Sequence, residues 1–297
     1  MKRERAARWL VAAVTLASSG PLGCGVDHTG RLVAAIRGGE PAPADSNVVA
    51  VVNFAGGHCS GSLITPHLVL SARHCVADTF DEDAPVICGE TDFRDPDSPG
   101  AVFVVAEPEI TSDPADYRAL REIVLPEGVA SDLCGTDVVL LVLKEPIQGI
   151  RPLEPRLDVP VAAGEYYSAV GFGVDEAEDG HPAGVRKRLD DLQVECSGDQ
   201  CQFDDIRGNE WLGSGGPCSG DSGGPALDVD GRVIGVVSRG TDGCGDPVFG
   251  DVASRSEWLR AQAIRVAKSY GEPPTEWVPC GEANPCPIEE PEEPVED

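Results

Sequence analysis

The sequence has few aromatic residues, few basic residues and no long hydrophobic run. Aromatic residues make up 5% of the 297 residues, so valine, leucine, isoleucine and alanine must fill most of the core. Lysine and arginine number 23 against 51 aspartates and glutamates, which gives a formal net charge of −28. Because so much negative charge repels phosphates, we expect no nucleic-acid partner.

No apolar segment reaches the roughly 20 residues that are needed to cross a bilayer. The first apolar stretch, residues 9–17, is short and follows Lys2, Arg3, Arg5 and Arg8. Basic residues before a short apolar run are typical of a secretory signal. We therefore expect an exported protein that is secreted, periplasmic or held in the cell envelope.

The end of this signal is open between two alternatives. Pro21-Leu-Gly-Cys24 resembles a bacterial lipobox, in which the cysteine is lipidated, although Leu is expected where Pro21 stands. The alternative is ordinary cleavage near Ser19. The sequence has 11 cysteines, and removing Cys24 leaves ten, which can all pair in an oxidising compartment. This arithmetic favours lipidation of Cys24 and anchoring to a membrane.

Long helical patterns are also scarce, whereas glycine and proline are abundant. The 35 glycines and 25 prolines indicate many turns and favour a β protein. Runs rich in β-branched residues, bounded by turn formers, predict strands at 49–54, 68–71, 102–105, 138–143, 166–172 and 233–238. An Asp-Gly pair at 230–231 predicts a hairpin turn within residues 227–233.

One helix is predicted near the C-terminus. Ser254 and Glu257 fit a capping box, in which each side chain bonds a free backbone N–H of the first turn. Gly271 can end the helix. Apolar residues fall on one face of it, namely Leu259, Ala263, Val266 and Ala267.

We divide the chain into a signal (1–24), a propeptide (25–35), a main domain (36–270) and an acidic tail (271–297). After Lys268 the sequence has nine acidic residues, seven prolines and no basic residue. Such a composition predicts a solvated, disordered tail.

The strongest chemical signal is Gly-Asp-Ser-Gly-Gly-Pro at 220–225. A serine between glycines lies on a sharp turn, where its hydroxyl is exposed and backbone N–H groups can converge on an oxyanion. Residues 220–224 also satisfy the Gly-x-Ser-x-Gly pattern of α/β-hydrolases, whose catalytic histidine follows the serine. The five histidines are at 28, 58, 67, 74 and 181, so none follows Ser222 and that fold is excluded.

The order His, Asp, Ser has a match at each step. Ser-Ala-Arg-His-Cys at 71–75 follows an apolar strand, and Asp137, unlike its competitor Asp132, directly precedes the strand at 138–143. With residues 220–225, these segments resemble the trypsin/chymotrypsin-like serine proteases over about residues 36–268. The resemblance implies an all-β fold of two packed six-stranded antiparallel β-barrels with a C-terminal helix. It also implies a serine endopeptidase with His74, Asp137 and Ser222 as its catalytic triad.

The same resemblance assigns further roles. The N–H groups of Gly220 and Ser222 would form the oxyanion hole. Ile36-Arg-Gly-Gly resembles the family's mature N-terminus, so cleavage before Ile36 would free an α-amino group that pairs with Asp221. Proteins or peptides would be the substrates of a monomer, and no cofactor or metal is implied. An acidic loop at Glu90 and Asp92 leaves calcium binding as the alternative to plain solvation.

Disulfides and substrate contacts also follow from the family pattern. Cys59 would bridge to Cys75, and Cys218 would bridge to Cys244. The segment Ser238-Arg239-Gly240 matches the edge that binds the substrate backbone. The other cysteines are expected to pair as Cys196 with Cys201, Cys280 with Cys286 and, by elimination, Cys88 with Cys134.

Several positions depart from the family pattern. Arg73 replaces an alanine beside His74, and Arg239 replaces a tryptophan, which we expect to change the preference of the outer subsites, towards acidic residues. Gly216, followed by Pro217, occupies the position at the pocket base where trypsin has an aspartate. On the opposite wall Pro247 would favour small apolar residues, whereas a one-residue slip would bring in Asp246 and a basic preference. Arg73, together with Arg37 in the segment after Ile36, keeps a second hypothesis open, a catalytically inactive protease-like binding module of the cell envelope.

Overall fold

The computed structural model describes residues 36, 38–54, 56–80, 85–126, 128, 130–173, 184–203, 205–241 and 244–278. The predictions on residues 1–35, which include Cys24 and His28, lie outside these ranges, as do those on His181, Cys280 and Cys286. Within the described ranges no helix combines the length and apolar character that a membrane span requires.

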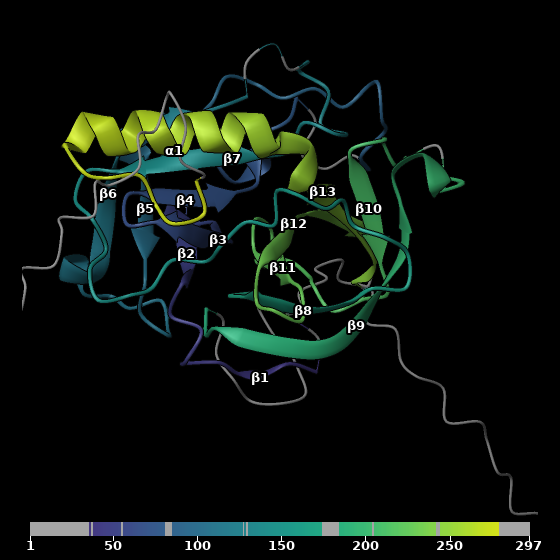
Figure 1. Cartoon of the computed structure of the whole chain (residues 1–297), viewed down its shortest axis with the longest axis horizontal. Helices are drawn as coiled ribbons and strands as arrows, with labels where there is room; N and C mark the ends of the chain where they lie inside the picture. Colours follow the sequence, from purple (N-terminus) through teal and green to yellow (C-terminus); the bar gives the residue numbers. More distant parts are fainter. Residues whose placement is uncertain are drawn as a thin grey trace, which may run out of the picture. The chain divides into compact units, whose positions relative to one another are not determined.

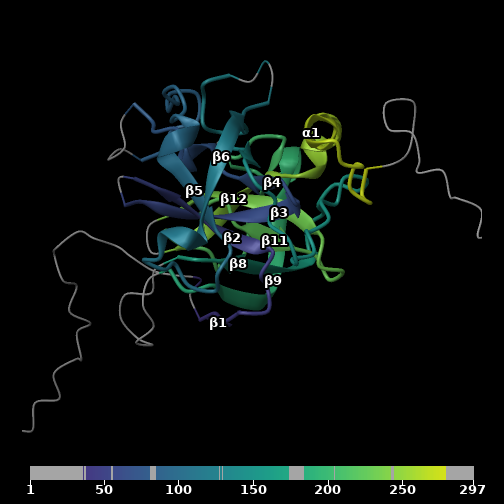
Figure 2. The same ribbon diagram turned by 90° about the vertical axis from the view of Figure 1, so that its left-hand side faces the viewer.

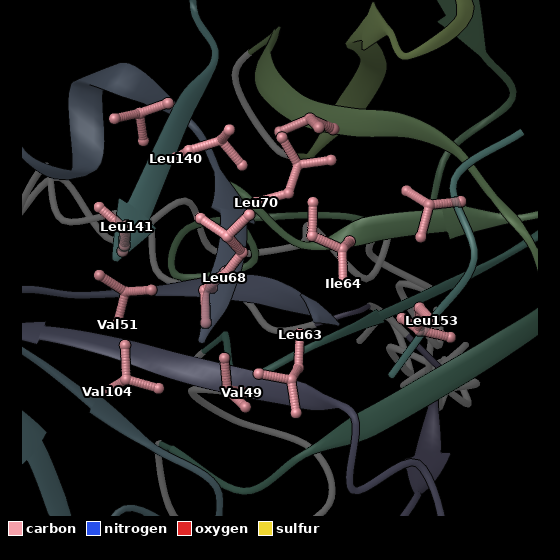
Figure 3. Packing of buried hydrophobic residues seen from close by; sticks show 14 of the residues in the cluster. Val49, Val51, Leu63, Ile64, Leu68, Leu70, Val104, Leu140, Leu141 and Leu153 are labelled. Atoms are coloured by element: carbon pink, nitrogen blue, oxygen red, sulfur yellow. The ribbon is translucent and has the colours of Figure 1, made fainter. Parts of the chain in front are cut away.

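Six antiparallel strands close the first barrel in the order β2-β3-β4-β7-β6-β5, because β5 pairs with β2. In the chain they are β2 (Val48–Asn53), β3 (His58–Thr65), β4 (Leu68–Ser71), β5 (Val102–Val105), β6 (Tyr117–Val124) and β7 (Val139–Leu143). Valine and leucine side chains from these strands fill its interior, as Figure 3 shows for Val51, Leu70 and Leu140. The scarcity of aromatic residues is thus compensated by close packing of aliphatic ones.

The second barrel is also antiparallel and closed, since its order β9-β10-β13-β12-β11-β8 returns from β8 to β9. Its strands are β8 (Tyr166–Gly171), β9 (Lys187–Ser197), β10 (Glu210–Gly213), β11 (Pro225–Leu227), β12 (Val233–Thr241) and β13 (Gly245–Asp251). The short β1 (Glu40–Pro41) adds to β9. Three aromatic rings lie at the centre of this core among aliphatic side chains. Trp211 is stacked on Phe249 with 4.0 Å between the ring centroids, and Tyr167 packs edge-on against both rings.

Helix α1 (Ser256–Tyr270) lies along the first barrel (Figures 1 and 2), and Leu259, Ala263 and Val266 join that barrel's core. Gly271 ends it in the left-handed conformation, with φ of 71°. The predicted capping box is wrong, because the hydroxyl of Ser254 donates to the carbonyl of Asp251 and the N-cap residue of the helix, Arg255, forms no side-chain cap. Instead the carboxylate of Asp251 accepts from the N–H groups of Ala253 and Ser254 in the preceding 3-10 turn, η5 (Ala253–Arg255).

The chain continues to pack on the first barrel after the helix. Trp277 donates its indole N–H to the carbonyl of Ile64 at 2.8 Å, and Val278 is buried in the core. Tyr270 donates its hydroxyl to the carbonyl of Leu143. The contacts of the main domain thus extend past the boundary that we expected at residue 270.

The structure contains both disulfides that the resemblance implied, Cys59–Cys75 and Cys218–Cys244, and two further bridges, Cys196–Cys201 and Cys88–Cys134. The predicted fold of two six-stranded barrels with one C-terminal helix is confirmed.

Candidate active site

His74 and Asp137 are brought together by neighbouring strands of the first barrel. His74 lies in the 3-10 turn η1 (Arg73–Cys75) just after β4, and Asp137 lies just before β7. Because β4 pairs with β7 from Ser71 opposite Val139, the two strand ends meet. The ring Nδ1 of His74 is 2.8 Å from Asp137 Oδ2, and the backbone N–H of His74 donates to Asp137 Oδ1 at 2.9 Å.

A third bond to Asp137 comes from the second barrel. Ser238, in β12, donates its hydroxyl to Asp137 Oδ2 at 2.6 Å, and the carboxylate is only 2% exposed. Burial raises the pKa of Asp137, but the charge of His74 and these hydrogen bonds outweigh it, so its pKa lies below the usual value. Burial lowers the pKa of His74, but the Asp137 carboxylate raises it above the ordinary value. A buried anion therefore orients and supports the imidazole, whose side chain is 26% exposed.

Ser222 and His74 both lie close to the Cys59–Cys75 disulfide. The Sγ of Cys75 is 3.7 Å from the carbonyl oxygen of Ser222, and both sulfur atoms lie within 4.8 Å of a ring nitrogen of His74. Ser222 and Ser238 line the same pocket. The structure therefore gathers His74, Asp137 and Ser222 at the junction of the two barrels.

The loop that carries Ser222 leaves two backbone donors available. No residue in the described part of the chain accepts a hydrogen bond from the N–H of Gly220 or of Ser222. Gly220 has φ of 91°, a conformation that favours glycine, and a Cβ there would lie 2.7 Å from His58 Nε2. The absence of a side chain thus lets the loop approach His58, to which our sequence analysis gave no role.

Asp221 is almost fully buried, and it accepts from the N–H of Gly173 at 2.8 Å and of Cys218 at 3.0 Å. Burial raises its pKa to about 7, although these bonds and the nearby charge of Lys187 act in the opposite direction. Ile36 is buried in the second barrel's core. In the uncleaved chain the nitrogen of Ile36 is an amide, so the ion pair that the resemblance implied cannot form.

A pocket of ≈ 300 Å³ opens beside Ser222, between the Cys218 segment and β12. Its lining includes Pro217, Val237 and Pro247, and among the described residues no carboxylate lines it. Asp246 does not enter it and instead accepts from the hydroxyl of Thr241. The lining comprises Pro217, Cys218, Ser219, Ser222, Val237, Ser238, Arg239, Gly240, Thr241, Cys244 and Pro247.

Gly216 does not appear among those lining residues. A Cβ at Gly216 would lie 2.8 Å from Leu192 Cδ1, so this position is packed against β9. Gly216, the residue expected at the pocket base, thus does not line the pocket, whereas Pro217, which follows it, does.

Arg239 forms an ion pair that the sequence did not reveal. Its guanidinium is bidentate on Glu210, with N–O distances of 2.6 and 2.8 Å, and it also donates to the carbonyl of Asp205. Glu210 is buried and accepts from the N–H groups of Gly135 and Arg207. These bonds commit the guanidinium to acceptors within the protein and do not support our expectation of a preference for acidic substrate residues.

Two further residues that we considered in the sequence, Arg73 and His67, are held by contacts within the protein. The guanidinium of Arg73 stacks over Phe93 at 4.3 Å and donates to the carbonyl of Ala130. His67 stacks on Tyr270 and lies 3.3 Å from a carboxylate oxygen of Glu272. Glu90 and Asp92 belong to no cluster of three or more potential metal ligands among the described residues.

The sequence is similar to a protein family and to several known proteins. A family model described as Trypsin matches residues 36–260. Serine protease 57 of Rattus norvegicus is 32% identical over 235 residues, which cover 75% of this chain and 81% of the rat protein. Granzyme M of Homo sapiens is 30% identical over 257 residues, covering 78% and 90%. Kallikrein-1 of Mus musculus is 28% identical over 238 residues, covering 71% and 82%.

These relatives are mammalian, and they lend no support to the bacterial source that the lipobox resemblance favoured. The family match spans both barrels, the segment of His74 and Asp137, and the loop of Ser222. The chain belongs to the trypsin family of serine proteases.

Proposed function

We propose that this protein is a serine endopeptidase in which His74, Asp137 and Ser222 act as the catalytic triad. Ser222 Oγ attacks the scissile carbonyl of a protein or peptide substrate while His74 Nε2 takes its proton. His74 then passes the proton to the leaving amine as the peptide bond breaks and the acyl-enzyme forms. In the second half His74 takes a proton from the attacking water and returns it to Ser222 Oγ as the acid product leaves. The N–H groups of Gly220 and Ser222 stabilise the oxyanion of both tetrahedral intermediates.

The observation that carries this proposal is the buried carboxylate of Asp137, which receives three hydrogen bonds. Two come from His74 and the third comes from Ser238. An ionised acid in this position holds the histidine in one orientation and stabilises the imidazolium that forms during proton transfer. The N–H groups of Gly220 and Ser222, which have no acceptor in the described part of the chain, supply donors for the oxyanion.

The pocket beside Ser222 bears on substrate preference. Proline and valine in its walls, together with the position of Asp246 outside it, support a preference for small apolar residues before the scissile bond. Peptide substrates with Ala or Val at that position should therefore be cleaved faster than those with Arg or Lys.

We propose export through the signal at 1–24, with the four disulfides forming in an oxidising compartment. Lipid attachment at Cys24, as in a bacterial lipoprotein, belongs to the same proposal. The propeptide at 25–35, the acidic tail and a monomeric state complete the proposed organisation.

The direct test is labelling with a fluorophosphonate probe of protein cleaved before Ile36. We expect the wild type to be labelled stoichiometrically, because only an activated serine reacts with the probe. Ser222→Ala should remain unlabelled, and Ser219→Ala, a neighbouring serine, should label like the wild type. An unlabelled wild type with a confirmed Ile36 N-terminus would favour the inactive binding module instead.

Activation by cleavage before Ile36 makes a separate prediction about stability and pH. The folded-state pKa of Asp221, about 7, exceeds the unfolded value of about 3.9. The folded chain therefore binds this proton more tightly, and the contribution of Asp221 to the free energy of unfolding falls as pH rises from about 4 to 7. A free Ile36 amino group beside Asp221 would lower that pKa and reduce the loss.

Thermal melting between pH 4 and 7.5 measures this effect in the Ser222→Ala background, where self-digestion is absent. As pH rises, the Tm of the cleaved protein should increasingly exceed the Tm of the uncleaved protein. Asp221→Asn is the control, since both forms should then lose this part of the pH dependence. Parallel Tm curves for the cleaved and uncleaved forms would contradict the pairing of Ile36 with Asp221.

A further inference from the structure

The hydroxyl of Ser60 links the oxyanion loop to the rest of the site. Ser60 lies in β3, next to Cys59. It is completely buried. Its hydroxyl donates to the carbonyl of Gly220 at 2.9 Å and accepts from the N–H of Phe172 at 2.9 Å. One side chain thus joins the first barrel, the end of β8 and the nucleophile loop.

The backbone of Ser60 reinforces this link. Its N–H donates to the carbonyl of Ser222 at 2.7 Å, and its carbonyl accepts from the hydroxyl of Ser71, three residues before His74. Ser60 therefore holds the carbonyl groups of Gly220 and Ser222, the two residues whose N–H groups are left without acceptors among the described residues. Between them, the carbonyl of Asp221 accepts from Gly224 at 2.8 Å.

Gly220 is the part of the loop that most needs such a restraint. A glycine populates many φ and ψ values, so its own backbone does little to fix the direction of its N–H. Fixing its carbonyl from the first barrel limits the rotation of the peptide unit between Gly220 and Asp221, and the N–H of Gly220 is joined to that unit through the Gly220 Cα. Donors aimed in advance at a developing oxyanion stabilise it without reorganisation during the reaction, and loss of one such donor lowers kcat about 10²- to 10³-fold.

We infer that Ser60 is a positioning residue, whose hydroxyl holds Gly220 so that the N–H of Gly220 points into the oxyanion hole. This inference rests on the proposed endopeptidase function. Ser60 touches neither substrate nor the reacting atoms, and it acts through the carbonyl of Gly220. It should therefore affect binding of the transition state more than binding of the substrate.

The surroundings of Ser60 decide which substitutions are informative. A Cβ at Gly171 would lie 3.0 Å from Ser60 Oγ, and one at Gly224 would lie 3.1 Å from Ser60 Cβ, so larger side chains do not fit. Ser60→Ala keeps the Cβ and removes only the hydroxyl, which leaves the carbonyl of Gly220 and the N–H of Phe172 unpartnered. Ser60→Gly opens space in which water can replace the hydroxyl.

Ser62 provides a matched control two residues along the same strand. It is equally buried, but its hydroxyl has no hydrogen-bond partner among the residues that the structure describes. Ser62→Ala thus removes the same atom from the same strand without touching the oxyanion loop. Its kcat should stay within about two-fold of the wild type.

The test combines peptide hydrolysis with inhibition by a peptide boronic acid, a transition-state analogue that reacts with the serine. Rates are divided by the number of sites that the fluorophosphonate probe labels to completion, so misfolded protein does not count. We expect Ser60→Ala to lower kcat 10- to 100-fold and to raise the boronate Ki by a similar factor, with KM within about three-fold of wild type. Ser60→Gly should fall between Ser60→Ala and the wild type.

A purely structural role would lower the amount of labelled protein but leave kcat per labelled site unchanged. If Ser60→Ala and Ser60→Gly both keep wild-type kcat and boronate Ki, the inference is wrong while the proposed function stands. If wild-type protein itself is not labelled, the proposed function fails and the inference fails with it.

Discussion

Replacement of Asp137 by asparagine is expected to lower kcat about 10⁴-fold while KM and the fold are retained. The substitution preserves the size of the side chain, but an amide has one oxygen where the carboxylate has two. In this site both oxygens accept, one from the backbone N–H of His74 and one from its ring and from Ser238. An amide NH₂ facing Nδ1 would stabilise the wrong tautomer of His74, which cannot accept the proton of Ser222 through Nε2.

The pH profile separates this effect from general damage. The wild-type kcat/KM should rise with pH through the pKa of His74, which lies above the ordinary 6.5 because Asp137 stabilises the protonated ring. In Asp137→Asn the negative charge is lost and the pKa of His74 falls. The midpoint of the pH profile of the remaining activity should therefore shift to lower pH than in the wild type. Asp132→Asn, at the competing acid of the same loop, should change kcat by only a few fold. A large loss in Asp132→Asn with a small one in Asp137→Asn would reverse the assignment.

Strands β2, β4, β5, β7, β8 and β12 and the nucleophile loop could be predicted because their signals are local, whereas β3, β6, β9, β10 and β13 were not predicted. The strand at residues 68–71 is confirmed as β4, and the one at 102–105 as β5. The Asp-Gly turn also joins β11 to β12 as predicted, with Gly231 at φ of 78°. In each case the residues that determine the structure lie within a few positions of one another, so periodicity and turn chemistry were sufficient.

The remaining features depend on partners distant in sequence. The Ser60 hydroxyl bonds Gly220, 160 positions away, and the docking of Trp277 on Ile64 spans 213 positions. Neither pairing leaves a periodic or spacing signal in one sequence. Our sequence analysis accordingly gave Ser60 no role.

The capping of α1 shows how a local pattern can also mislead. Ser254 and Glu257 have the correct spacing for a capping box, but the chain forms the 3-10 turn η5 before the helix. In this turn the backbone N–H groups of Ala253 and Ser254 face Asp251, and the carboxylate of Asp251 accepts a hydrogen bond from each. A carboxylate is a stronger acceptor than a serine hydroxyl. Asp251 therefore caps η5, and Ser254 does not cap α1.

The ion pair between Arg239 and Glu210 makes the largest prediction about stability. Glu210→Ala should lower the free energy of unfolding by about 3–5 kcal/mol, because it leaves a buried guanidinium without its counter-charge. The side chains of Arg239 and Glu210 are only 10% and 1% exposed. Urea unfolding at neutral pH measures the loss. Arg265→Ala is the matched control, since its pair with Glu122 is exposed and should contribute at most about 1 kcal/mol.

A double substitution tests whether the cost arises from an unpaired charge. Arg239→Trp introduces the family's usual residue but leaves Glu210 buried without its counter-charge, so it should destabilise the protein about as much as Glu210→Ala. Combining Arg239→Trp with Glu210→Ala removes both charges and should recover much of the loss, since a buried ion pair replaced by apolar groups is often neutral in stability. If the losses of the two single variants simply add, the residues do not act as a pair. Because Glu210 also bonds Gly135, two residues before Asp137, the recovered stability need not restore kcat. A double variant that is stable but slow would show that this carboxylate also positions the acid of the triad.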